Sequence, residues 1–293
     1  MESILTPLPQ EELFVLGHTA CAGCGEAIAI RVAMKALGKD TIVCISTGCH
    51  HYFSARCENS SWSVPVIHVL SHNAPAVASG VEVAMRRLGK KTNVVVFAGD
   101  GETFDIGADS LAEMLERNQN IIYVCLDNEA YMNTGVHKTG LTPIGALTGT
   151  TPVTGNPCLK GDVISFVRKH GAEYIAASTV AHPRDIYKKV KKATELEEPS
   201  FIHILAPCPI GWGFDSSKTI EVAKLALDTC LWINFEMVDG EITNILRVKR
   251  RPVVDYLKMQ GRFQHLFRSE ESKKIIERIQ KLADDNAKEF GLI

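Results

Sequence analysis

Short apolar runs alternate along the first two thirds of the chain with longer stretches in which apolar residues recur at helical spacing. The apolar runs lie at residues 41–45, 64–70, 93–98, 121–126 and 200–205. The helical stretches lie at residues 26–37, 75–88, 104–117, 163–170 and 183–196. Strands that alternate with helices are typical of an α/β fold, in which helices cover a mostly parallel sheet.

The alternation fades toward the C-terminus, where the pattern predicts helices at 218–231 and 270–289 but no further strand. We therefore expect two parts: an α/β domain at residues 1–215, and a mainly helical extension at 216–293 that packs on this domain or on partner subunits. Residues 129–162 have little periodicity and are rich in Thr, Gly and Pro. A loop of that length in a compact domain is usually functional or covered by a partner.

Charge and hydropathy exclude several classes of partner. The 293 residues include 32 basic and 34 acidic side chains, so no overall field favours nucleic acid or a membrane surface. The longest apolar runs have the length of strands and fall short of the roughly 20 residues of a membrane-spanning helix. The first residues, MESILTPLPQEELF, carry acidic side chains in place of the basic region of a signal peptide. We therefore predict a cytoplasmic protein.

Nine cysteines are many for a cytoplasmic chain, in which disulfides rarely persist. Cys44 and Cys125 lie inside apolar runs and are expected to pack there as small hydrophobic residues. Cys21 and Cys24 stand three positions apart in GHTACAGCGE. This spacing fits a redox dithiol, part of a zinc site, part of an iron-sulfur site or a plain loop before a helix. A thioredoxin-like dithiol would follow a strand, and no strand pattern precedes Cys21.

An acidic and an amide side chain follow two strands of the predicted sheet. The strand at 93–98 leads into the sequence GDG, which contains Asp100, and the strand at 121–126 is followed closely by Asn128. Open α/β sheets bind ligands at the carboxyl ends of their strands. Two oxygen ligands at that edge can hold Mg²⁺, which commonly bridges a protein to a diphosphate.

The spacing of these two residues resembles the thiamine diphosphate motif. The resemblance implies that the side chains of Asp100 and Asn128, together with the carbonyl of Ala130, hold the Mg²⁺ that anchors the diphosphate. It also implies that Gly99 and Gly101 contact the cofactor, with Gly101 close to its phosphates. The residue before Asn128 is an aspartate, where the motif often has a second asparagine.

A wider set of motifs extends the resemblance over about residues 15–232. Together they resemble the β subunit of the 2-oxoacid:ferredoxin oxidoreductases, especially the pyruvate synthase branch. The motifs are GHTACAGCGEAIAIR, STGC, SHNAPAVASGVE, FAGDGETFDIG, LDNEAYMNTG and ILAPCPIGW. The resemblance implies a thiamine diphosphate-binding α/β fold with helices on both faces of the sheet. It further implies that Cys21, Cys24, Cys49 and Cys208 bind one [4Fe-4S] cluster close to the thiamine.

Three further residues are assigned by the same resemblance. Thr47 and Gly48, just before Cys49, are expected to line the cofactor pocket. Asn133 is expected near the reacting carbon, where an amide can hydrogen-bond a carboxylate or a developing oxyanion. From the residues alone, Asn133 before Thr-Gly also fits an ordinary turn.

The family chemistry is the oxidative decarboxylation of a small 2-oxoacid. Thiamine diphosphate acts as the electron sink while CO₂ leaves, the cluster passes electrons one at a time to ferredoxin, and coenzyme A takes the acyl group. The chain shows neither a motif for the glutamate that activates the pyrimidine ring nor the C-x₂-C-x₂-C-x₃-C-P run of a ferredoxin. The resemblance therefore implies an α subunit with the pyrimidine half-site, a γ subunit and a ferredoxin-like δ subunit, or fused equivalents.

Histidines near the expected site depart from the pyruvate-type pattern. His50 and His51 follow Cys49, and His72 precedes Asn73. Such side chains can pair with a second carboxylate of a substrate, or simply hydrogen-bond to backbone. These four residues, His50, His51, His72 and Asn73, are therefore candidates for the substrate side. Oxalate or another small polar 2-oxoacid, with or without coenzyme A, stays an alternative to pyruvate.

Two alternatives come from other functional classes. The chain could be a zinc-stabilised assembly subunit that uses its sheet only as an interface. It could also be a thiol-disulfide oxidoreductase that uses Cys21 and Cys24, in which case Cys49 and Cys208 would be dispensable.

Overall fold

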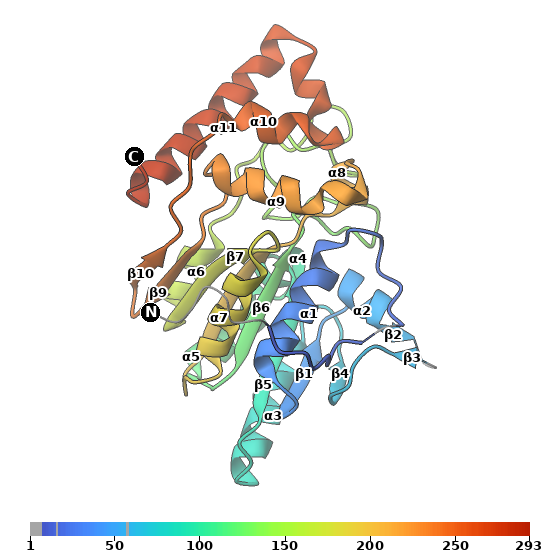
Figure 1. Ribbon diagram of the computed structural model, residues 1–293, viewed down its shortest axis with the longest axis vertical. Coiled ribbons are helices and arrows are strands. Elements are labelled where there is room, and N and C mark those ends of the chain that lie inside the picture. The colour runs from blue at the N-terminus through green and yellow to red at the C-terminus, as the bar shows by residue number, and fades with distance from the viewer. Residues whose placement is uncertain (1–7, 16, 57–58) are drawn as a thin grey trace.

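The computed structural model describes residues 8–15, 17–56 and 59–293. Residues 1–7, on which the signal-peptide expectation partly rests, lie outside this described part. The described residues form one eight-stranded sheet with helices against both faces (Figure 1). In chain order its strands are β1 (Thr41–Ile45), β4 (Val66–His68), β5 (Asn93–Gly99), β6 (Ile122–Asp127), β7 (Tyr174–Thr179), β8 (Ser200–Leu205), β9 (Phe235–Val238) and β10 (Glu241–Ile245). A separate pair consists of β2 (Ala55–Arg56) and β3 (Asn59–Ser60).

The order across the large sheet is β10-β9-β7-β8-β6-β5-β1-β4. Its strands β1, β4, β5, β6, β7 and β8 pair in parallel, while β9 runs antiparallel to β7 and β10 antiparallel to β9. The carboxyl ends of the six parallel strands therefore meet at one edge of the sheet, where α/β proteins bind ligands.

Helices connect these strands and extend beyond them. They are α1 (Gly25–Leu37), α2 (Cys49–Ser54), α3 (Ala74–Arg87), α4 (Asp100–Phe104), α5 (Ala108–Glu116), α6 (Val163–Lys169), α7 (Pro183–Ala193), α8 (Pro209–Trp212), α9 (Thr219–Asp228), α10 (Val253–Lys258) and α11 (Glu270–Glu289). Two short 3₁₀ helices are η1 (Ser216–Lys218) and η2 (Gly261–Phe267).

Two hydrophobic cores lie on opposite faces of the sheet. Val95 and Phe97 of β5 pack in the core that α1 and α7 cover, whereas Val94 and Val96 pack in the core that α3, α5 and α6 cover. Successive side chains of a strand point to opposite faces, so a strand covered on both faces must be apolar throughout. This requirement explains why the central strands appear in the sequence as continuous apolar runs.

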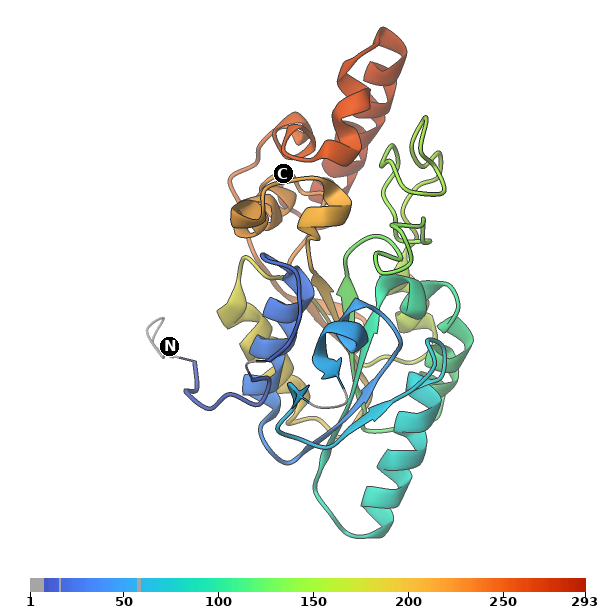
Figure 2. The same cartoon turned by 90° about the vertical axis from the view of Figure 1, so that its right-hand side faces the viewer.

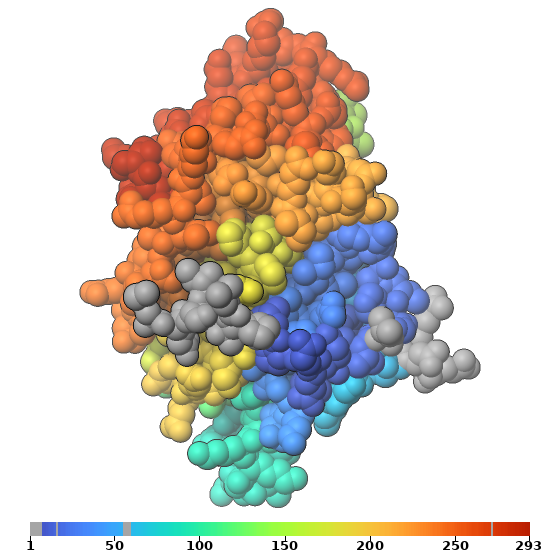
Figure 3. Space-filling view, in the orientation of Figure 1, coloured from blue at the N-terminus to red at the C-terminus, as the bar shows by residue number. Residues whose placement is uncertain are grey.

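The carboxyl edge of the sheet is covered by the C-terminal helices and by the long loop at 128–162. The two lie side by side above the sheet (Figure 2), and the backbone N–H of Leu147 in this loop donates to the carbonyl of Arg262 in η2 at 3.0 Å. The C-terminal segment forms the upper part of the surface in Figure 3. Within the described residues, no helix combines the length and the hydropathy needed to cross a bilayer.

Most expected elements are confirmed. The strands at 41–45 and 200–205 and the helix at 270–289 have the expected bounds. The long loop contains no named helix or strand, as expected. The strand expected at 64–70 is shorter than predicted, because only Val66–His68 pair with the neighbouring strand β1.

The helix expected at 104–117 is confirmed over Ala108–Glu116 but does not begin where expected. The chain forms α4 and α5 instead, with a break at residues 105–107. The carboxylate of Asp105 accepts the backbone N–H of Gly140 at 3.0 Å, which turns the chain toward the long loop. Gly107 then begins the next helix as its N-cap residue.

The expectation that the strand at 200–205 is the last is wrong. Strands β9 and β10 follow it and extend the same sheet. The exposed edge strand β10 carries little apolar sequence and gives no strong signal. Strand β7 was not predicted either, because its sequence YIAAST has no long apolar run. The division at residue 215 stays a prediction, but the segment after it contributes two strands to the sheet as well as helices.

Candidate active site

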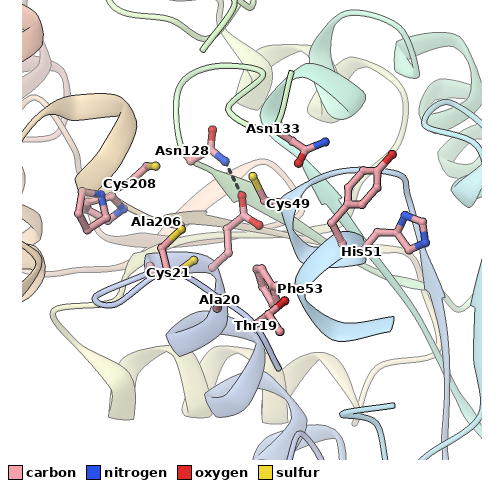
Figure 4. Close-up of a pocket in the computed structure, with 16 residues that line it drawn as sticks. Thr19, Ala20, Cys21, Cys49, His51, Phe53, Asn128, Asn133, Ala206 and Cys208 are labelled. Carbon is pink, nitrogen blue, oxygen red and sulfur yellow. Dashed lines mark hydrogen bonds between the residues drawn. The ribbon is translucent and has the colours of Figure 1, made fainter. Parts of the chain in front are cut away.

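Two adjoining cavities lie at the carboxyl edge of the sheet. The cysteine-side cavity, of about 600 Å³, is lined by Cys21, Cys24, Cys49, Cys208 and their neighbours (Figure 4). The aspartate-side cavity, of about 260 Å³, is lined by Asp100 and residues that follow β1, β5 and β6. The residues that line both cavities are Glu26, Cys49, Tyr52, Asn128 and Asn133. A reactant in one cavity is therefore separated from the other cavity by single side chains.

The four predicted cluster ligands come from three separate elements. Cys21 lies in the loop before α1, Cys24 is the N-cap residue of that helix, and Cys49 is the first residue of α2. Cys208 is the N-cap residue of α8. All four are free thiols. Across the part of the chain that the structure describes, no three or more His, Cys, Asp or Glu side chains converge closely enough to form a metal site as they stand.

Burial raises the pKa of the Cys24, Cys49 and Cys208 thiols, and the carboxyl group of Glu26 adds to the effect. Without a cation these thiols stay protonated at neutral pH. A bound metal reverses this preference, because thiolates are the species that bind metal. The backbone N–H of Gly211 already donates to the Cys208 sulfur at 3.3 Å, and such N–H groups stabilise negative sulfur.

Two glycines let the cysteine loop approach the end of β8. A Cβ atom on Gly23 would lie 2.3 Å from the carbonyl oxygen of Ser216, and the φ of Gly23 is +72°. A Cβ atom on Gly25 would lie 2.5 Å from the carbonyl carbon of Ala206. These contacts bring Cys21 and Cys24 to the same cavity as Cys208. No named strand precedes Cys21 within residues 8–15 and 17–20, which disfavours a thioredoxin-like dithiol.

The aspartate-side cavity gathers most of the predicted cofactor ligands. Its lining includes Thr47, Gly48, Gly99, Asp100, Asn128, Ala130 and Asn133. Gly101 does not line it, because the ring of Tyr131 covers this glycine: a Cβ atom there would lie 2.1 Å from the ring. The cofactor roles of these residues stay predictions.

Asp100 is buried at the start of α4, where the hydroxyl of Thr139 donates to its Oδ2 at 2.5 Å. Burial raises the pKa of the Asp100 carboxyl, and the charge of Asp127 raises it further. A cation bound nearby would stabilise the ionised form of this carboxyl group and lower its pKa.

A buried network of charged side chains, which the sequence did not indicate, includes the residues on either side of Asn128. Asp127 pairs with Lys160 and with His203, each at 2.8 Å. Burial opposes ionisation of Asp127, but these two partners outweigh it and lower the pKa of its carboxyl to about 2. Glu129 pairs with Lys160 at 2.8 Å and with Arg262 at 2.6 Å. The partners lie far apart in the sequence and form no local motif.

Glu26 is a second feature that the sequence did not indicate. Its Oε1 accepts a short hydrogen bond from Nδ2 of Asn128, the dashed line in Figure 4, and its Oε2 lies 3.2 Å from Nδ1 of His50. The other ring nitrogen of His50, Nε2, lies 3.2 Å from the hydroxyl of Ser46. Both nitrogens of this buried histidine are therefore engaged by the protein.

The remaining predicted substrate-side residues are dispersed. His51 lines the cysteine-side cavity, and the centroid of its ring lies 4.6 Å from the ring centroid of His68. His72 and Asn73 line neither of the two cavities, and Asn73 instead precedes α3 as its N-cap residue. Their substrate-side role stays a prediction.

The chain is similar to several known proteins. The model of the C-terminal thiamine pyrophosphate-binding domain of thiamine pyrophosphate enzymes matches residues 42–204. The chain is 50% identical to pyruvate synthase subunit PorB of Methanosarcina barkeri, over 94% of this chain and 96% of that one. It is 40% identical to ketoisovalerate oxidoreductase subunit VorB of Pyrococcus abyssi, over 94% and 91%.

A solved structure is similar as well. It is a 2-oxoglutarate:ferredoxin oxidoreductase from Magnetococcus marinus with 2-oxoglutarate, coenzyme A and succinyl-CoA bound. It superimposes with a TM-score of 0.58 and 26% sequence identity, covering 71% of this chain and 77% of that one.

Proposed function

Because this chain belongs to the family of the thiamine diphosphate-binding β subunits of 2-oxoacid:ferredoxin oxidoreductases, we propose that it acts in the oxidative decarboxylation of pyruvate to acetyl-CoA and CO₂. The observation that carries the proposal is the pair of cavities that share Glu26, Cys49, Tyr52, Asn128 and Asn133. One cavity offers oxygen donors and the other offers four thiols. A decarboxylation site and a one-electron acceptor would then be immediate neighbours.

The aspartate-side cavity fits a magnesium-bound thiamine diphosphate. Asp100, Asn128 and the carbonyl of Ala130 would hold the Mg²⁺, which prefers oxygen ligands. Thr47 and Gly48 would line the same pocket at the end of β1. When bound, thiamine diphosphate supplies the electron sink for loss of CO₂ from a 2-oxoacid.

The cysteine-side cavity fits an iron-sulfur cluster in its chemistry. Cys21, Cys24, Cys49 and Cys208 are the four thiols that would hold one [4Fe-4S] cluster, for which four thiolates are the usual set. The cluster would supply a one-electron acceptor. Binding requires the buried thiols of Cys24, Cys49 and Cys208, whose pKa is raised, to release their protons, so we expect cluster loading to be more favourable at higher pH.

The lining of the aspartate-side cavity favours a substrate with a single carboxylate. Glu26, Asp100 and Glu102 contribute carboxyl groups, and none of the described residues that line it is Lys or Arg. His50 is already engaged on both ring nitrogens, so it is not free to pair with a second carboxylate. Oxalate would therefore find no Lys or Arg for its second carboxylate among the described residues that line this cavity, whereas the methyl group of pyruvate could contact apolar side chains such as Ile106.

Asn133 lines both cavities and would orient the substrate. Its amide can donate to a carboxylate or to an oxygen that becomes negative during reaction. Such a donor acts most strongly in a site that excludes water, because the local dielectric is low.

The chain would work inside a larger complex. We propose an α subunit that supplies the pyrimidine half-site with its glutamate, a γ subunit and a ferredoxin-like δ subunit, or fused equivalents. Ferredoxin would accept the electrons, and coenzyme A would accept the acyl group.

The proposal is tested by an anaerobic assay of the purified complex with ferredoxin or a viologen as acceptor. Pyruvate, oxalate, 2-oxobutyrate and 2-oxoisovalerate are compared by kcat/KM. We expect pyruvate to give the highest value and 2-oxobutyrate a lower one. Activity confined to oxalate or to the branched 2-oxoisovalerate would show that the substrate assignment is wrong, and a complex without iron would contradict the cluster.

A further inference from the structure

The carboxyl group of Glu26 lies between the two cavities and lines both. Glu26 is 2% exposed and stands in the first turn of α1, two residues after Cys24. We propose that Glu26 is a positioning residue: it orients the amide of Asn128 for metal binding and connects the Cys21 and Cys24 loop to the magnesium ligands. This inference rests on the proposed function, since it concerns the same metal site.

The orientation of the Asn128 amide decides whether it can bind Mg²⁺. An amide offers an oxygen on one side and an NH₂ group on the other, and a half-turn about its last torsion exchanges the two. Nδ2 of Asn128 donates to Glu26, while Oδ1 accepts the backbone N–H of Ala130 at 3.2 Å. A carboxylate only accepts hydrogen bonds. Glu26 therefore selects the orientation in which the oxygen, the atom that Mg²⁺ requires, is turned away from the carboxylate.

Glu26 is itself held from both sides. Its second oxygen lies 3.2 Å from Nδ1 of His50, and the ring of His50 packs on Gly48, where a Cβ atom would lie 2.5 Å from Cε1. The start of α1 is fixed by Gly25, whose N–H donates to the carbonyl of Pro207 at 3.2 Å. With these contacts the carboxyl group has little freedom to turn away from Asn128.

The same contacts join the thiol ligands to the metal ligands. His50 follows Cys49 in α2, and Glu26 follows Cys24 in α1. Any movement of these two helix starts that accompanies cluster binding is transmitted to Asn128 through two hydrogen bonds. We therefore expect the affinity for Mg²⁺ and thiamine diphosphate to depend on whether the cluster is present.

The experiment measures Mg²⁺ binding by titration calorimetry at a fixed, saturating concentration of thiamine diphosphate, with the anaerobically purified complex. Glu26→Ala removes the acceptor, and we expect it to raise the Kd for Mg²⁺ by about 10- to 100-fold, the usual effect of losing an outer partner of a metal ligand. Glu26→Gln keeps an oxygen that can accept from Asn128 but can also turn its NH₂ group toward it, so its Kd should rise less than that of Glu26→Ala.

A buried glutamate elsewhere provides the matched control. Glu82 in α3 is 8% exposed, accepts from the amide of Gln119 at 3.2 Å and lines neither of the two cavities. Glu82→Ala should lower thermal stability yet leave the Kd for Mg²⁺ unchanged. Should Glu26→Ala fail to assemble, Glu26→Met, which keeps the length of the side chain without an acceptor, replaces it.

Removal of the cluster supplies the second readout. In wild type, cluster-free complex should bind Mg²⁺ and thiamine diphosphate more weakly than cluster-loaded complex, and in Glu26→Ala the two forms should bind alike. An unchanged Kd in Glu26→Ala, or an equal rise in Glu82→Ala, would overturn the inference while the proposed function stands. A wild-type complex that binds neither Mg²⁺ nor thiamine diphosphate would overturn the proposed function itself.

Discussion

At the scale of single residues, local motifs could be predicted and long-range partners could not. Asp100 and Asn128 each follow a strand, so their meeting at one sheet edge follows from the order of the elements. Glu26 reaches Asn128 across 102 positions, and Arg262 reaches Glu129 across 133. The tertiary fold brings such partners together, and the sequence around a single acidic or basic residue does not indicate which residue it will pair with.

The buried pairs that Asp127 forms with Lys160 and His203 determine how the free energy of unfolding changes at acidic pH. The carboxyl pKa is about 2 in the folded chain, against an ordinary value of 3.8. A lowered pKa stabilises the folded state above the ordinary value, and this contribution is lost as the pH falls from about 4 to about 2. Asp127→Asn should therefore lower the free energy of unfolding at pH 7 by about 2 kcal/mol.

The measurement is denaturant unfolding of wild type and Asp127→Asn between pH 7 and pH 3. The difference between the two proteins should shrink toward the acidic end, because wild type loses the same contribution there. A difference that stays constant with pH would mean that the Lys160 and His203 pairs do not hold the aspartate ionised.

At the scale of elements, the strands that carry the site were predictable because each is covered on both faces and is therefore apolar throughout. The start of α1 is different, since its position depends on how closely backbone can pack. Gly23 has a φ of +72° and a Cβ atom there would lie 2.3 Å from Ser216. Gly38, which follows the same helix, has a φ of +78° and no atom within 4 Å of a Cβ.

Alanine variants of these two glycines distinguish the energetic cost of backbone strain from the cost of steric overlap. Gly38→Ala should lose about 1–3 kcal/mol, because its φ of 78° with a ψ of −179° is a backbone conformation essentially restricted to glycine. Gly23→Ala should lose about 1–3 kcal/mol more, because the overlap with backbone adds to the strain. It should also lower the iron content of the complex, as the loop with Cys21 and Cys24 moves away from Cys208. Thermal unfolding and iron analysis check both variants, and equal behaviour of the two would contradict the packing argument.

At the scale of the whole molecule, the parallel sheet brings two kinds of chemistry to one edge. Oxygen donors follow β5 and β6, thiols precede α1, begin α2 and follow β8, and the long loop closes over them together with the C-terminal helices. The α/β class and the loop were predictable from periodicity. The antiparallel pair β9 and β10 was not, because β9 has only four residues and the edge strand β10 is mostly exposed and needs few apolar residues.

In the proposed function, electrons pass from a substrate in the aspartate-side cavity to a cluster held by the four cysteines. The most direct measurement is the visible absorbance of the anaerobic complex after pyruvate and coenzyme A are added without ferredoxin. The absorbance should bleach in wild type and stay unchanged in Asp100→Asn, whose iron content should match wild type. Bleaching that persists in Asp100→Asn, or none in a wild-type complex loaded with iron and thiamine diphosphate, would contradict the account.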